Sequence, residues 1–256
     1  MFMGLSRART FPPPRELPDS GMVGVRTAPP LPCGLRSATC PRMDTTYDPP
    51  QDPLKILHDD HELVFVDKPS GLLSVPGKGE HLADCLIERV RRVFPTVLLV
   101  HRLDRDTSGV MVFALTPLAQ RHLGWQFEER TAKKTYIARL WGEMAEKEGV
   151  VDLPLMVDWP NRPKQIVSPE GRPAVTRWTA LKRGNNETRV RLYPETGRSH
   201  QLRVHMQALG HPILGDPFYA EGPAREHERL MLHAESLSLR HPDGGRQFKV
   251  KSPVPF

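Results

Sequence analysis

The sequence predicts an α+β fold, in which strands outnumber helices and the two types do not alternate regularly. Three segments, residues 134–142, 174–181 and 188–194, alternate polar and apolar side chains with the two-residue period of half-buried strands. Segments with helical spacing are fewer and scattered, whereas a doubly wound sheet alternates strands and helices in order. With 256 residues, 38% of them hydrophobic, the chain is long enough to bury a real core.

Residues 1–50 differ in composition from the rest of the chain. They hold a large share of the 27 prolines, including the run Pro12-Pro13-Pro14, and show neither helical nor strand periodicity. Proline-rich segments of this kind do not bury enough apolar surface to fold. We therefore expect residues 1–50 to form a disordered extension and residues 51–256 to form the folded domain.

The first part of this domain is predicted to contain strands, a turn and a helix. The apolar run of residues 63–66 leads into Lys-Pro-Ser-Gly at 68–71, which is typical of a strand followed by a turn. Residues 81–94 carry apolar side chains at helical spacing and predict a helix. Short β-rich runs at 96–100 and 110–115 predict two further strands.

Two later helices have recognisable ends. Thr116 and Pro117 have the residue types of an N-cap and a first helical position, so a helix is predicted to begin there. Farther along, Ser199 is predicted to cap a second helix, which Gly210 and Pro212 end.

Charge and cysteine content limit the classes of function. The formal net charge of +6 favours a polyanionic partner, with nucleic acid the first choice. Cys33, Cys40 and Cys85 are an odd set without C-x-x-C spacing, which argues against a disulfide framework and indicates a reducing, cytoplasmic compartment. No uninterrupted apolar stretch approaches 18 residues and no compact secretory segment is present, so no membrane association is expected.

A highly charged short stretch, H-R-L-D-R-D-T-S-G at 101–109, lies at a predicted strand end and turn. A hydrolase triad of His101, Asp104 and Ser108 is disfavoured, because triad members usually converge from distant segments and no G-x-S-x-G elbow is present. Asp104 could project from the end of a strand into a cleft, or it could bond to the backbone of the turn, a role that suits Asp106 better. Spacing alone leaves both roles of Asp104 open.

The many histidines raise the question of a metal site. Neither H-E-x-x-H nor paired-cysteine spacing is present, so no bound metal is expected and local hydrogen bonding is the favoured role. The histidines considered are His101, His200, His205, His211 and His233.

The stretch H-R-L-D-R-D-T-S-G resembles the catalytic signature of the RluA family of pseudouridine synthases. Three other stretches resemble family segments in the right order: VFVDKPSGLLSVPG, KKTYIARLWG and TGRSHQLRVHMQALGHPILGDPFY. A further stretch, LMLHAESLSLRHP, also resembles the family. The resemblance extends over residues 54–256. It implies a pseudouridine synthase core with a mixed, mainly antiparallel sheet, flanking helices and a basic cleft, without the S4-like domain of some members.

The family resemblance also implies an activity, the isomerisation of uridine to pseudouridine in structured RNA without a cofactor. Residues 151–165, VDLPLMVDWPNRPKQ, are similar to the branch that modifies both tRNA and large-subunit ribosomal RNA. This similarity implies uridine 32 of a tRNA anticodon stem-loop and uridine 746 of 23S rRNA as targets. RNA is then the expected partner of a monomeric enzyme that needs no obligate protein partner.

The resemblance assigns roles to single residues. Asp104 is expected to add covalently to ribose C1′ or to uracil C6, and the sequence does not choose between these routes. Tyr136 is expected to stack on the target base and to move a proton at C5, and Arg198 is expected to pair with Asp104 and orient it. The target must be flipped out of the RNA. Contacts to the RNA are expected from His101, Arg102, Lys133, Lys134 and Arg203.

Two alternatives to a synthase stay open on the sequence. One is a non-catalytic RNA-binding protein on the same fold, acting in ribosome assembly or tRNA folding, although RNA binding alone requires none of Asp104, Tyr136 and Arg198. The other is an N-glycosidase that cuts the same bond and releases free uracil. The loop at residues 211–216, H-P-I-L-G-D, is expected only to frame the pocket.

Overall fold

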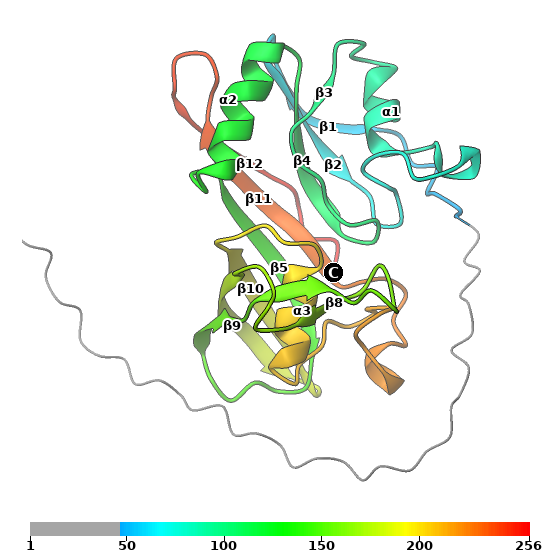
Figure 1. Ribbon diagram of the computed structural model, residues 1–256, viewed down its shortest axis with the longest axis vertical. Helices are drawn as coiled ribbons and strands as arrows, with labels where there is room; N and C mark the ends of the chain where they lie inside the picture. The colour runs from blue at the N-terminus through cyan, green and yellow to red at the C-terminus, as the bar shows by residue number, and fades with distance from the viewer. Residues whose placement is uncertain (1–46) are drawn as a thin grey trace, which may run out of the picture. The chain divides into compact units, whose positions relative to one another are not determined.

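The structure, a computed structural model, describes residues 47–256, and within that range the α+β prediction is confirmed (Figure 1). Almost all of the segment predicted to be disordered, residues 1–50, lies outside the described range. The main sheet runs in the order β1-β2-β4-β11-β5-β10-β9-β6, with β12 paired to β11 and β3 to β4. No helix among the described residues is both long and apolar enough to cross a membrane.

One half of the sheet is covered on both faces. Its strands are β1 (Lys55–Asp59), β2 (Leu63–Lys68), β3 (Leu98–Leu99) and β4 (Ser108–Ala114). Along β2, Val64 and Val66 pack with α1 (Leu86–Arg91), whereas Leu63 and Phe65 pack with α2 (Pro117–Glu128). Because alternate side chains of a strand point to opposite faces, the continuous apolar run of β2 is explained by a helix on each face.

The other half of the sheet carries the three strands predicted from alternation. They are β5 (Lys133–Trp141), β9 (Val175–Gly184) and β10 (Glu187–Pro194), and β6 (Glu148–Asp152) forms the edge. Helix α3 (Gln201–Ala208) packs Leu202 and Met206 against this half. A separate hairpin of β7 (Leu155–Val157) and β8 (Gln165–Val167) lies on α3, where Leu155 packs with Val204.

The two halves are joined by β11 (Leu232–Arg240), which is parallel to β4 and antiparallel to β5. β12 (Gln247–Lys251) extends the sheet from β11. Gly109 makes the parallel contact feasible, because a Cβ at this position would lie 2.3 Å from the carbonyl oxygen of Ala234. The junction brings the segment before β4 close to β5. That segment is the charged motif of residues 101–109, which runs into the start of β4.

Two details of the predicted helices are wrong. The helix expected over residues 81–94 is a 3₁₀ turn (Glu80–Leu82) followed by the short α1, because the extended Cys85, the N-cap of α1, separates the two. Ser199 does not cap α3; the N-cap is His200 in a left-handed conformation, without a side-chain cap. The start of α2 is as predicted, because Thr116 Oγ1 accepts a hydrogen bond from the Ala119 amide at 3.1 Å.

Candidate active site

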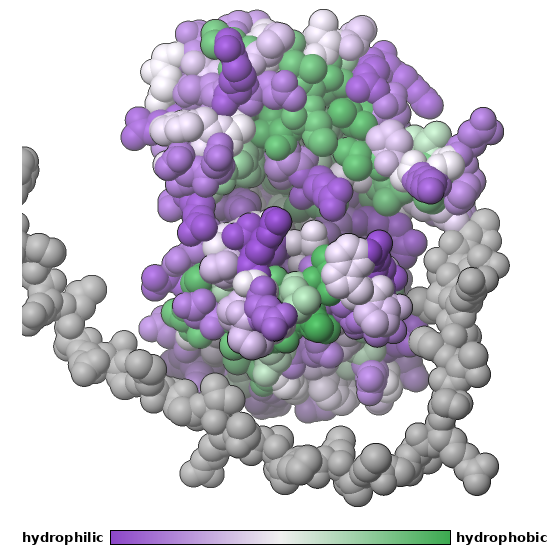
Figure 2. All heavy atoms as spheres, viewed as in Figure 1, coloured by the Kyte–Doolittle hydropathy of each residue, from purple (hydrophilic) through white to green (hydrophobic). Residues whose placement is uncertain are grey.

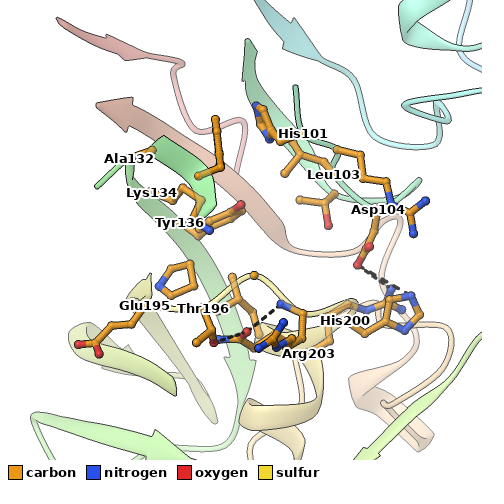
Figure 3. A pocket seen from close by; sticks show the side chains of 18 of the residues that line it. His101, Leu103, Asp104, Ala132, Lys134, Tyr136, Glu195, Thr196, His200 and Arg203 are labelled. Atoms are coloured by element: carbon orange, nitrogen blue, oxygen red, sulfur yellow. Dashed lines mark hydrogen bonds and ion pairs between the residues drawn. The ribbon is translucent and has the colours of Figure 1, made fainter. Parts of the chain in front are cut away.

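A cavity of about 500 Å³ opens where the two halves of the sheet meet (Figure 3). Its walls are the loop of residues 101–107, the start of β5, the segment 194–203 leading into α3, and the end of α2. In the space-filling view the described domain is hollowed across the middle, and hydrophilic side chains line the hollow (Figure 2). The volume lies within the range typical of small-ligand sites.

Asp104 projects into this cavity from the loop between β3 and β4, with 31% of its side chain exposed. Its loop is fixed by the segment after β2. Ser74 Oγ donates to the Leu103 carbonyl at 2.6 Å and accepts from the Leu103 amide at 3.2 Å, and Ser70 Oγ donates to the Asp106 carbonyl at 2.6 Å. A loop bonded at several points holds its side chain in one place, which a catalytic group requires.

Lys68 lies beneath the same loop and is fully buried. Its ammonium donates to the carbonyls of Arg105, at 2.7 Å, and Pro69, at 2.9 Å. Burial lowers the pKa of Lys68 to about 7, although the nearby charges of Asp106 and Asp104 oppose the shift. The K-P-S-G turn therefore supports the Asp104 loop rather than contacting a ligand.

The arginine that pairs with Asp104 is Arg203, so the prediction that Arg198 makes this contact is wrong. Arg203 Nη1 lies 3.4 Å from Asp104 Oδ2. Arg198 is half-buried at the cavity, and its Nε donates to the Pro173 carbonyl at 3.1 Å. The reason is the geometry of the helix start: Arg198 precedes α3 and reaches the Pro173 carbonyl, whereas Arg203 lies within α3 and is buried.

Arg203 is not an RNA phosphate contact either, because its side chain is only 2% exposed. Its other nitrogens form a two-pronged contact with Asp216, Nε to Oδ2 and Nη2 to Oδ1, each at 2.7 Å. Burial alone would lower the pKa of Arg203, but the hydrogen bonds and charge of Asp216 and the charge of Asp104 raise it overall. Arg203 is therefore a fixed, permanently charged partner for Asp104.

Asp216 gives the H-P-I-L-G-D loop a chemical role that the sequence did not reveal. It is fully buried, and its Oδ1 also accepts the amides of Phe218, at 2.9 Å, and Tyr219, at 3.2 Å. Gly215, with φ of +71°, permits the turn, since a Cβ there would lie 1.9 Å from the Arg229 carbonyl oxygen. The loop thus does more than frame the pocket: it orients the arginine that faces Asp104.

His200 forms a second contact near the carboxylate. Its Nε2 lies 3.9 Å from Asp104 Oδ2, and its Nδ1 is hydrogen-bonded to the Tyr219 hydroxyl at 2.7 Å. Burial lowers the pKa of His200, with the charge of Asp104 opposing that shift. In Figure 3 Asp104 points toward His200 and Arg203 from across the cavity.

Tyr136 lies on β5, as predicted, and lines the cavity together with Asp104 (Figure 3). Its neighbours across the sheet are Ala234 on β11 and Leu192 on β10, so the ring stands at the centre of the sheet. Burial raises the pKa of Tyr136 and the charge of Asp104 adds to this effect. The phenol therefore stays protonated and presents an aromatic face to the cavity.

The residues expected to contact RNA divide into two groups. Arg102 is exposed, lines the cavity and forms no ion pair with any other described residue. Lys133 is exposed outside the cavity and donates to the Arg130 carbonyl at 3.3 Å. Lys134 lines the cavity, and burial lowers its pKa, with Arg130 adding to the effect. These three positions are compatible with RNA contacts.

His101 has a packing role instead. Its Nε2 accepts a hydrogen bond from the Val112 amide at 3.1 Å, and its ring stacks on Phe127 with 4.6 Å between ring centroids. Burial lowers the pKa of His101 to about 3, and the charge of Lys134 contributes. The His101 ring is neutral and is hydrogen-bonded to β4, so it offers no positive charge to a phosphate. These observations do not support the expected contact with RNA.

The disfavoured triad does not form. Ser108 Oγ is hydrogen-bonded to His233 Nδ1 at 2.8 Å, and Arg229 donates to the same hydroxyl, so His101 and Ser108 do not converge. His205 and His211 also bond locally, to Thr176 Oγ1 and the Trp141 carbonyl. Between residues 47 and 256 no three His, Cys, Asp or Glu side chains are grouped so as to hold a metal ion.

The fold and the cavity define a class of protein, the RNA pseudouridylate synthases, whose family model matches residues 62–208. A solved structure, human RNA Pseudouridylate Synthase Domain Containing 1, is similar with a TM-score of 0.66 and 30% identity, over 79% of this chain and 84% of that one.

Curated relatives narrow the class to a family. The dual-specificity RNA pseudouridine synthase RluA of Escherichia coli strain K12 is 54% identical over 214 residues, 82% of this chain and 98% of that protein. The protein of the same name from Yersinia pestis is 53% identical over 204 residues, 78% of this chain and 99% of that one. The chain belongs to the RluA family of pseudouridine synthases, and its reaction is the isomerisation of uridine in RNA.

Proposed function

We propose that the chain isomerises uridines in a tRNA anticodon stem-loop and in large-subunit ribosomal RNA, with Asp104 as the nucleophile. The observation that carries the assignment of the site is the placement of Asp104 against the Arg203–Asp216 pair in the cavity that Tyr136 also lines. The relatives named dual-specificity synthases support two RNA substrates.

The reaction needs no external reagent, because its product is an isomer of the substrate. The bond between ribose C1′ and uracil N1 breaks, the base turns, and a bond between C1′ and C5 forms. The C5 proton is lost and N1 gains one. Asp104 adds to C1′ or to uracil C6 and leaves again, while Arg203 fixes the carboxylate by charge and geometry. Tyr136 supplies the stacking face for the detached base, worth about 1–3 kcal/mol.

Extrusion of the target uridine is required, and the rim of the cavity is suited to it. Unstacking costs about a few kcal/mol and is least for bases already in loops. Arg102 stands exposed at the cavity beside Asp104, where it can fill the space that the flipped base leaves or bind a phosphate. Arg198 also lines the cavity, and its proximity to Arg102 there supports a contact with the RNA backbone rather than the pairing with Asp104 that the sequence predicted.

The test is product formation on an unmodified tRNA anticodon stem-loop and on a 23S rRNA fragment, read as a carbodiimide-stable adduct. Wild type should form pseudouridine and Asp104→Asn should not. Asp106→Asn is the matched control, since Asp106 pairs with Arg105 at 2.8 Å and does not line the cavity. Product from Asp104→Asn at the wild-type rate would refute the nucleophile, free uracil would indicate an N-glycosidase, and no product from wild type on either RNA would favour a non-catalytic RNA-binding protein.

A further inference from the structure

We propose that Trp159 and Arg162, at the tip of the β7–β8 hairpin, form a stacking platform for an unpaired RNA base near the target uridine. This inference rests on the proposed function and adds a binding site outside the catalytic cavity, since neither residue lines that cavity. The base stacks on the indole, and Arg162 and Lys164 lie within reach of the phosphates beside it.

The first observation is the exposure and stacking of the indole. Trp159 is 62% exposed. This exposure is unusual, because it leaves a large apolar ring surface in water. The guanidinium of Arg162 lies over the ring, with Cζ 3.4 Å from the ring centroid. This cation–π contact fixes the orientation of the indole and puts a positive charge beside it. An aromatic face with an arginine beside it is a combination used to bind single-stranded nucleic acid.

The second observation is that the tip is held by its own hydrogen bonds. The Asp158 amide donates to the Lys164 carbonyl at 3.0 Å, and the Lys164 amide donates to the Asn161 carbonyl at 3.1 Å. The Asn161 side chain donates to Asp158 Oδ2 at 2.9 Å. A preformed tip loses little conformational entropy when a ligand binds, so most of the stacking energy is available for affinity.

The third observation links the hairpin to the cavity. The Gln165 amide, at the start of β8, donates to the Tyr219 hydroxyl at 2.8 Å, and that hydroxyl is bonded to His200, the neighbour of Asp104. In Figure 1 the hairpin lies over α3, on the side of the domain where the hollow of Figure 2 is seen. An RNA whose uridine enters the cavity therefore passes near the hairpin.

Charge favours RNA as the occupant. The tip carries Arg162 and Lys164 against the single acid Asp158, and Arg102 and Arg198 line the cavity. An apolar protein partner would instead meet charged side chains beside an isolated indole. Because stacking accepts every base, the platform adds affinity for unpaired nucleotides without reading their sequence.

The experiment measures the affinity of two RNAs for variants in an Asp104→Asn background, which removes turnover from the readout. One RNA is the unmodified anticodon stem-loop, and the other is a fully paired duplex of equal length. Trp159→Ala should raise the Kd for the stem-loop about tenfold, within the range of one stacked base, and change the Kd for the duplex less than about twofold. Trp159→Phe should keep most of the affinity for the stem-loop that Trp159→Ala loses.

Trp125→Ala is the matched control, because Trp125 is also exposed, at 54%, but lies on α2 and does not line the cavity. It should bind both RNAs as the background protein does. Intrinsic fluorescence gives a second readout that does not need the alanine variant to fold: the stem-loop should quench the emission, and Trp159→Phe should remove most of the quenching.

Equal affinities of Trp159→Ala and Trp125→Ala for the stem-loop would overturn the platform, and so would an equal loss on both RNAs. Fluorescence quenching that persists in full in Trp159→Phe would do the same. These outcomes are separate from the fate of the proposed function, which is decided by pseudouridine formation in wild type.

Discussion

Arg198 and Arg203 come from one stretch of sequence and lie in different environments, since Arg198 is half-buried at the cavity before α3 and Arg203 is buried within α3. Arg198 bonds to a backbone carbonyl, whereas Arg203 is held by one carboxylate, Asp216, and presents its remaining nitrogen to another, Asp104. The comparison teaches that a motif locates the site, but burial and partners decide which of its charged residues serves the chemistry and which is free to meet RNA.

The largest expected effect comes from breaking the buried pair. Asp216→Asn leaves the Arg203 charge buried without its full partner, so we expect the free energy of unfolding to fall by about 3–5 kcal/mol. Urea denaturation measures this loss. At a temperature where the variant remains folded, we expect the single-turnover rate to drop at least tenfold while RNA affinity changes little, because Arg203 no longer holds Asp104 in position.

The matched control is Glu187→Gln, which disrupts a two-pronged pair with Arg139 whose side chains are 24% and 30% exposed. Pairs open to solvent contribute only about 0–1 kcal/mol. A loss of stability in Glu187→Gln equal to that in Asp216→Asn would contradict the distinction between the fully buried pair and a partly exposed one.

A smaller effect is expected from the pH dependence of His101. The pKa of His101 is lowered to about 3 in the folded state, against about 6.5 in the unfolded chain. As pH falls below 6.5 the unfolded chain takes up a proton that the folded chain does not, so stability present at pH 7 is progressively lost. At pH 5 the free energy of unfolding is lower by about 2 kcal/mol because of this residue.

His101→Gln should show a weaker pH dependence by that amount when the free energies of unfolding at pH 7 and pH 5 are compared. Glutamine can still accept a hydrogen bond from the Val112 amide but does not titrate. The other buried histidines remain in both proteins and cancel in the difference. Identical pH dependence in the two proteins would mean that His101 is readily protonated in the folded state and is available to an anionic ligand after all.

The strands were predictable because their environment is regular. Two-residue alternation identified β5, β9 and β10, and burial alternates clearly along β10 and the first part of β9, whereas Ile137 and Ala138 are buried in succession on β5. The helix over residues 81–94 was overpredicted because a 3₁₀ turn and a short helix in succession imitate one apolar stripe. Leu82 is oriented by a contact with Gly77 rather than by a continuous helix.

The site was predictable in part. The family resemblance singled out Asp104 and Tyr136, which line one cavity in the structure, but Ser199 could not be rejected as a cap from the sequence. α3 has no side-chain cap, and the Gln201 side chain instead fixes the segment before the helix by accepting hydrogen bonds from the Arg198 amide at 3.0 Å and the Thr196 hydroxyl at 2.7 Å. Buried residues run without a break from 201 to 206, so α3 has no purely solvated face. Arg203 lies within this buried run, and a buried arginine requires carboxylate partners. Its position in the helix is the signal that would have identified it as the partner of Asp104.

The most direct test of the account compares the single-turnover rates of Arg203→Lys and Arg198→Lys at saturating stem-loop RNA. Lysine keeps the charge but cannot hold Asp216 with two nitrogens and reach Asp104 with a third. We predict that Arg203→Lys loses at least a hundredfold in rate and that Arg198→Lys stays within about threefold of wild type. A severe loss in Arg198→Lys together with near-normal turnover in Arg203→Lys would contradict the account.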